Sequence, residues 1–195
     1  MERPIDGQHP KPPFYVDFIY HEHWQQHKEE RGNYLPGLEM AVLDPINVER
    51  NLYYLGREYF WRGMHDKALK LFDLALPKIW WMPEKGQAYV WMALIYKARK
   101  DYAKASECLH KSIEACNDRR EPWFELANLY EEQNMLEQAI TYYTAALAVP
   151  FKAHGYMNDM ALYGSLIPDR LAFAYNRMGN KEMAKECWIE AIKYI

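Results

Sequence analysis

Residues 120–150 read REPWFELANLYEEQNMLEQAITYYTAALAVP, and this stretch decides the fold. Its apolar residues recur at the spacing of two α-helices, which the polar pair Gln133-Asn134 separates. Small and bulky side chains alternate in a fixed order along the two runs: Ala127, Tyr130, Ala139, Tyr143 and Ala146. Antiparallel helices approach closely where a small side chain on one faces a bulky side chain on the other. The stretch therefore predicts a helical hairpin.

The same order of small and bulky residues occurs four times between residues 46 and 195. Each copy has a small residue, a tyrosine three positions later, an alanine twelve positions later and a bulky residue four positions beyond that alanine. The small residues are Gly56, Ala93, Ala127 and Ala172; the tyrosines are Tyr59, Tyr96, Tyr130 and Tyr175; the alanines are Ala68, Ala105, Ala139 and Ala184; the bulky residues are Phe72, Leu109, Tyr143 and Trp188. The steps between successive small residues are 37, 34 and 45 residues, and the long last step marks an insertion. Self-similarity of this kind indicates a stack of helical hairpins.

The turn residues agree with this division. We expect the four hairpins to reverse at Gly63-Met64, Arg99-Lys100-Asp101, Gln133-Asn134 and Gly179-Asn180. The copies fall near residues 49–82, 86–119, 120–150 and 165–195, and the aromatic content of an insertion at 150–165 predicts that it is packed.

This pattern resembles the tetratricopeptide repeat over residues 46–195. The resemblance implies an all-α fold, a right-handed α-solenoid of about four hairpins. Residues 1–45 differ, because six prolines favour an extended or irregular segment there. Within that segment, residues 14–20 are strand-like. The strand-like run could pack as extended chain on the first helices, pair with another protein or be the remnant of a lost sheet, and we favour the first.

A closer similarity is to the helical region that follows the catalytic domain of family 2 glycosyltransferases. The similarity is carried by Arg50 to Tyr59, Trp80-Trp81, the run from Arg119 to Ala127 and the insertion Gly155-Tyr156 to Tyr163. In a weaker match upstream, residues 14–23 resemble the closing strand and histidine of the catalytic domain, and residues 30–45 resemble the helix that connects it to the repeats. Such enzymes need a nucleotide-sugar domain with an Asp-x-Asp metal motif, and the sequence has neither that motif nor βαβ alternation. The resemblance therefore implies the appendage of such an enzyme without its catalytic part.

Charge and cysteine content indicate which partners and which compartment to expect. The net charge is −3 without a basic stripe, so we predict neither nucleic acid nor membrane as a partner. Three cysteines without metal-binding spacing, and no apolar leader, predict free thiols in the cytoplasm. Cys108 and Cys116 have no obvious His or Asp partner in the sequence and are predicted to be small core residues.

Two further groups have alternative interpretations. His21, His23 and His27 are the candidate metal ligands, although we favour a surface cluster or a former active-site histidine and predict no metal and no cofactor. Trp80-Trp81 could stack on a sugar or a partner, but packing between hairpins is favoured.

The first helix of each hairpin lines the inner groove of such a solenoid, where extended peptides bind. The predicted groove residues are Arg50, Tyr53, Arg57, Phe60, Trp61, Gln87, Val90, Leu94, Lys97, Phe124, Asn128, Glu131, Glu132, Asp169, Phe173, Asn176 and Arg177. We predict a binding module without catalytic activity of its own, whose partner is a protein or peptide. The alternatives are an accessory fragment or relic of a family 2 glycosyltransferase, which positions an acceptor for a catalytic partner, and self-association through the last helix.

Overall fold

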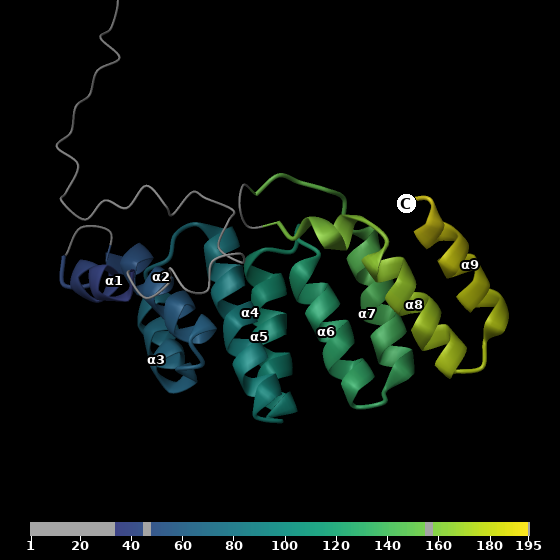
Figure 1. The fold of residues 1–195 in the computed structure, drawn as a ribbon, viewed down its shortest axis with the longest axis horizontal. Helices are drawn as coiled ribbons and strands as arrows, with labels where there is room; N and C mark the ends of the chain where they lie inside the picture. Colours follow the sequence, from purple (N-terminus) through teal and green to yellow (C-terminus); the bar gives the residue numbers. More distant parts are fainter. Residues whose placement is uncertain (1–33, 45–47, 155–157, 195) are drawn as a thin grey trace, which may run out of the picture.

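The computed structural model describes residues 34–44, 48–154 and 158–194. In this part of the chain the structure is helical, without a strand, and the helices stand side by side in antiparallel pairs that form a row (Figure 1). The elements are α1 (Leu35–Ala41), α2 (Val48–Trp61), α3 (His65–Ala75), α4 (Met82–Ala98), α5 (Tyr102–Ala115), α6 (Glu121–Glu132), α7 (Leu136–Ala148), the short 3-10 helix η5 (Met160–Tyr163), α8 (Leu166–Arg177) and α9 (Lys181–Ile192). The predicted all-α solenoid is confirmed. The strand-like run 14–20 and His21, His23 and His27 lie outside the described residues.

The four turns within the hairpins lie where the sequence predicts them. Gly63, Lys100, Asn134 and Gly179 adopt the left-handed conformation, with φ of 72°, 60°, 60° and 80°. In each turn the amide of the following residue donates to the carbonyl of the repeated tyrosine, at 2.8 Å in the first copy and 2.9 Å in the other three. The hydrogen bond from the residue after the left-handed one back to the last turn of the helix defines the Schellman motif. This motif ends a helix and reverses the chain.

The core repeats the contact of a small with a bulky residue. Ala68, Ala105, Ala127, Ala139, Ala172 and Ala184 are almost or fully inaccessible to solvent, as are the bulky residues Phe72, Leu109 and Tyr143. The fourth bulky residue, Trp188, is 37% exposed. It lies on α9, the last helix of the described structure, which packs on α8 but is not covered by another hairpin. Each hairpin therefore buries its small residues internally and shares its apolar flanks with its neighbours.

The insertion between α7 and α8 is packed where the structure describes it. Leu162 of η5 is 2% exposed, and the Phe151 and Tyr163 rings meet edge to face with centroids 5.0 Å apart. The Arg120 side chain, at the start of α6, donates hydrogen bonds to the carbonyls of Val149, Leu162 and Leu147 at 2.8, 2.9 and 3.1 Å. Those bonds satisfy carbonyls that helix ends leave open, so the insertion is fastened to the repeat that precedes it.

Candidate functional site

An open groove crosses the last three hairpins. It has a volume of about 510 Å³, within the range of ligand sites in proteins. The lining side chains come from α4, α6 and α8, the first helix of each hairpin: Lys97, Phe124, Asn128, Glu131, Glu132, Leu166, Arg170 and Arg177. The groove therefore follows the inner face that the repeat pattern predicts.

Glu131 organises the polar side of the groove. Its carboxylate lies 3.1 Å from the Arg170 guanidinium and 3.1 Å from the Arg177 guanidinium, and it accepts a hydrogen bond of 2.7 Å from the Tyr143 hydroxyl. The Glu131 side chain is only 10% exposed, whereas the two arginine side chains are 41% and 43% exposed. The carboxylate thus faces inward and holds two guanidinium groups that line the groove.

The Tyr143 hydroxyl supports this arrangement from below. It also lies 2.6 Å from the Asn128 Oδ1 atom and accepts a hydrogen bond of 3.3 Å from Arg170. Burial, together with the hydrogen bond to Glu131, raises the pKa of the Tyr143 phenol well above its ordinary value. The phenol therefore stays protonated at physiological pH and keeps the side chains of α6 and α8 in one register.

The apolar part of the groove lies beside these charges. Phe124 is half-buried, with its ring centroid 5.7 Å from that of Tyr143. Lys97 closes the α4 side and pairs with Glu125 of α6 at 3.0 Å. The result is a surface of mixed character, with an aromatic ring, a leucine and three basic side chains in one recess.

Six predicted groove residues meet here: Lys97, Phe124, Asn128, Glu131, Glu132 and Arg177. Leu166 and Arg170 are also in the lining but were not predicted. Helical spacing offered a signal for both, because Arg170 lies seven residues before Arg177 and Leu166 four before Arg170, all on one face of α8. Phe173 and Asn176 are exposed on α8 but do not line the recess.

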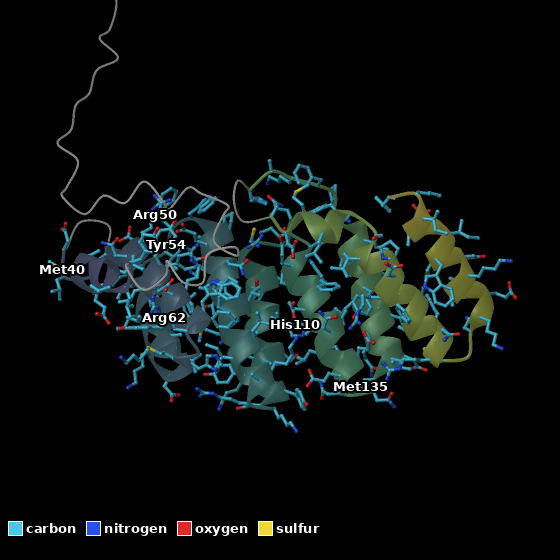
Figure 2. The ribbon with its side chains drawn as sticks, in the orientation of Figure 1. Met40, Arg50, Tyr54, Arg62, His110 and Met135 are labelled. Atoms are coloured by element: carbon cyan, nitrogen blue, oxygen red, sulfur yellow. The ribbon has the colours of Figure 1, made fainter. Side chains whose placement is uncertain are left out.

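The predicted residues of the first hairpin form a separate surface. Arg50 and Arg57 lie over the Tyr54 ring, 5.7 and 4.8 Å from its centroid, and Figure 2 shows Arg50 and Tyr54 close together at one end of α2. Phe60 and Trp61 both contact the Trp91 ring, at centroid distances of 4.7 and 5.3 Å. These side chains stabilise the junction of α2 and α4.

Three predicted groove residues are buried instead, and one of them is Val90, which is 3% exposed. Tyr53 is 1% exposed, with its ring between those of Tyr54 and Phe72. Gln87 is 9% exposed, and its Oε1 atom accepts a hydrogen bond of 2.6 Å from Arg119. All three are core residues, contrary to the prediction of an accessible position.

A second cluster of chemically capable side chains lies where α5 runs into α6. The Cys116 thiol donates a hydrogen bond of 3.1 Å to the Asp118 carboxylate, and the His154 imidazole of the insertion lies 2.9 Å from the same carboxylate. The structure thus gives Cys116 an aspartate partner that was not apparent in the sequence, and Cys116 and Cys108 are buried as expected. Burial and the Asp118 contact raise the pKa of the Cys116 thiol to about 12, so the thiol is not an activated nucleophile.

The residues that carry the glycosyltransferase resemblance have structural contacts. Arg119 is buried and donates to the Pro83 carbonyl at 3.1 Å, while the Glu121 carboxylate accepts from the Asp159 amide at 2.7 Å. Trp80 is 78% exposed in the loop before α4, and Trp81 is the half-buried cap residue of that helix.

Within the residues that the structure covers, no helix has the length and apolar character needed to cross a bilayer.

Comparisons with known proteins agree with this fold. The structure is similar to BtubC (BKLC) from P. vanneervenii, with a TM-score of 0.72 and 18% identity over 87% of this chain and 75% of that one. It is also similar to MamA, with a TM-score of 0.68 and 13% identity over 88% and 92% of the two chains. For MamA of Desulfovibrio magneticus RS-1 the TM-score is 0.66 and the identity 17%, over 90% and 93%.

At such identities the likeness concerns the fold alone. No curated protein sequence matches the chain. The family model described as tetratricopeptide repeat matches residues 86–119 and 121–151, which span α4 to α7. The described part of the chain is thus an all-α solenoid, of which residues 86–119 and 121–151 match the tetratricopeptide repeat.

Proposed function

We propose that this chain is a non-catalytic binding module, which holds a segment of a protein partner in the groove lined by α4, α6 and α8. The observation that carries the proposal is the pair of guanidinium groups of Arg170 and Arg177, both held by the inward-facing Glu131. Groups that are ordered before binding lose little conformational entropy when a ligand arrives. Helical-repeat solenoids use extended concave surfaces of this kind to bind partners.

The charges of the groove favour an acidic partner. Glu131 is almost covered and already accepts from Tyr143 and two arginines, whereas Arg170 and Arg177 keep more than a third of their side-chain surface exposed. An aspartate or glutamate side chain can accept from both guanidinium groups. Phe124 and Leu166 offer apolar contact for a neighbouring side chain of the same segment. We therefore infer a partner segment that combines a carboxylate with an apolar residue.

The proposal is tested by selecting peptides from a random library on the full chain and measuring their affinity by fluorescence polarisation. Selected peptides should be rich in Asp or Glu. The double variant Arg170→Gln/Arg177→Gln should weaken them by at least about tenfold, because charge-assisted hydrogen bonds are lost. The control Lys181→Gln/Lys185→Gln removes the same charge from exposed positions of α9 and should leave affinity unchanged.

Thermal unfolding of both double variants shows whether any loss is due to folding. If selected peptides bind the arginine variant as tightly as the unaltered protein, or if no peptide binds saturably, the groove is not the binding surface.

The alternative role, as an accessory part of a family 2 glycosyltransferase, stays a prediction from the sequence. Arg119, Arg120 and Glu121 have fold-stabilising contacts, Arg119 with the start of α4 and the other two with the segment that follows α7. Their presence therefore does not distinguish an enzyme appendage from an independent binding module.

A further inference from the structure

Three side chains with metal-binding atoms converge at the junction of the α4–α5 hairpin and the insertion. Cys116 caps the end of α5, Asp118 lies two residues later and His154 comes from the insertion after α7. The Cys116 Sγ atom, an Asp118 carboxylate oxygen and a His154 ring nitrogen all lie within 4.8 Å of one another. Two segments that are distant in the sequence therefore supply thiol, carboxylate and imidazole to one point.

The geometry centres on one oxygen. Asp118 Oδ1 is 3.1 Å from Cys116 Sγ and 2.9 Å from His154 Nε2. Cys116 is 8% exposed and the His154 side chain 10% exposed, whereas the Asp118 side chain is 31% exposed. The three atoms thus form a small triangle that is largely shielded, with access from solvent on the Asp118 side.

His154 provides the second observation. Its Nε2 atom is buried and has no hydrogen-bond partner, although it lies 2.9 Å from Asp118 Oδ1. Proximity without hydrogen-bond alignment means that the nitrogen is close to that oxygen but not directed at it. Two atoms that bind the same ion lie close together in this way, because the lone pair of each points to the ion and not to the other atom. A buried ring nitrogen without a partner is otherwise unfavourable.

Neighbouring residues hold the ligands in place. Lys152 pairs with the other carboxylate oxygen, Asp118 Oδ2, at 2.5 Å, so Oδ1 is the oxygen that faces Cys116 and His154. The Asn158 side chain accepts a hydrogen bond of 2.6 Å from the His154 amide and donates one of 3.1 Å to the Lys152 carbonyl. Such outer contacts orient metal ligands and fix their spacing.

We propose that Cys116, Asp118 and His154 bind a Zn²⁺ ion, which fastens the insertion to the end of the α4–α5 hairpin. Sulfur, nitrogen and oxygen ligands together suit Zn²⁺, whereas Mg²⁺ and Ca²⁺ require oxygen ligands alone. At zinc bond lengths of about 2.0 to 2.3 Å the ligand atoms of a tetrahedral site are roughly 3.3 to 3.8 Å apart. Asp118 Oδ1 lies 3.1 Å from Cys116 Sγ and 2.9 Å from His154 Nε2, and every pair of the three atoms lies within 4.8 Å. Small shifts of these side chains would therefore make room for the ion. Three protein ligands leave one position, on the exposed Asp118 side, for water. Binding displaces the Cys116 thiol proton.

Cobalt gives the proposal a spectroscopic test. We expect the full chain, reduced and freed of metal with a chelator, to bind one equivalent of Co²⁺ with a thiolate-to-metal charge-transfer band and the intense visible bands of a four-coordinate site. Added Zn²⁺ should remove both. Cys116→Ala should abolish the charge-transfer band, and His154→Gln should weaken Zn²⁺ binding by at least about tenfold. Without metal, the melting temperatures of these two variants should stay close to that of the unaltered chain.

Matched variants locate the ion. Cys187→Ala and His110→Gln remove the same chemical groups elsewhere and should leave binding unchanged. The triple variant His21→Asn/His23→Asn/His27→Asn should also bind normally. If Cys116→Ala does not fold, His154→Gln decides the matter. The proposal is overturned if the unaltered chain shows no charge-transfer band, if the band survives in Cys116→Ala or His154→Gln binds as tightly as the unaltered chain, or if the triple variant loses the site.

Discussion

At the scale of single residues, Gly56 shows how closely the first hairpin is packed. A Cβ atom at this position would lie 2.9 Å from the Phe72 Cε1 atom, which is closer than carbon atoms approach. Phe72 itself is fully buried, so its ring has no room to move away. The other three copies have alanine at the equivalent position and therefore allow a slightly wider approach. Gly56 is a packing requirement of this copy.

Gly56→Ala should consequently destabilise the protein by about 1–3 kcal/mol, as overpacking of a filled core does. Gly37→Ala is the matched control, because Gly37 also lies in a helix but has open space around its Cβ position, and it should be neutral or stabilise by up to about 1 kcal/mol. Urea denaturation followed by circular dichroism measures both. Equal stability of the two variants would contradict the packing argument.

At the scale of elements, the second helices of the hairpins differ in how they begin. Asp101 and Asn180 cap α5 and α9, each accepting a hydrogen bond of 3.2 Å from the amide three residues later. Met64 and Met135 occupy the same position before α3 and α7 and provide no such bond. Their backbones are alike, with φ/ψ of −84°/71° at Asp101 and −91°/70° at Met135. The geometry for a cap therefore exists in α7 without the side chain that would use it.

Met135→Asn should stabilise the protein by about 0.5–1 kcal/mol, since an asparagine in this conformation satisfies an open amide of the first turn. Met135 lies at the turn between α6 and α7 and is 38% exposed, so little apolar contact is lost (Figure 2). The denaturation midpoint should rise with an unchanged slope. Asp101→Ala provides the reverse experiment and should lower the midpoint by a similar amount. A cap explanation fails if Asp101→Ala is destabilising while Met135→Asn has no effect.

Elements and turns were predictable because their determinants are local and repeated. The tyrosine before each turn, the left-handed residue and the alanine of the second helix lie within one hairpin, so their spacing alone identifies them. Contacts between hairpins are less regular. Arg170 reaches Glu131 of the preceding repeat, and His154 reaches Asp118 through an insertion that has no counterpart in the other copies. The sequence could not reveal these meetings, since no repeated spacing encodes them.

At the scale of the whole molecule, the hairpins are unequally anchored. Helix α4 buries nine of its residues, among them Ala93 and Ile95, and it lies between two other hairpins. Helix α9 buries only Ala184 and Ala191, and its larger apolar side chains Ile189 and Ile192 are exposed. In a repeat protein each unit is stabilised by its own contacts and by its neighbours. Opening of α9 should therefore require less free energy than opening of α4.

Hydrogen exchange followed by mass spectrometry tests this difference. Amides in the central turns of α9 should exchange at least about tenfold faster than those of α4, a difference of about 1.4 kcal/mol in opening free energy. The comparison is made under conditions in which the whole chain stays folded, with α5 as an internal reference for a well-anchored second helix. Uniform protection across α4, α5 and α9 would mean that the array opens as one cooperative unit.

The contacts of Arg119, Arg120 and Glu121 have a consequence for how this array can evolve. In a helical-repeat array each unit contacts only its neighbours, so whole units can be added or removed where those contacts are alike. Here Arg119 binds the preceding hairpin at Pro83 and Gln87, while Arg120 and Glu121 bind the unrepeated segment that follows α7. Copying the third hairpin alone would leave one set of the Arg120 and Glu121 side chains without the segment that follows α7. The number and order of units in this region are therefore constrained by the side-chain contacts between the third hairpin and the unrepeated segment.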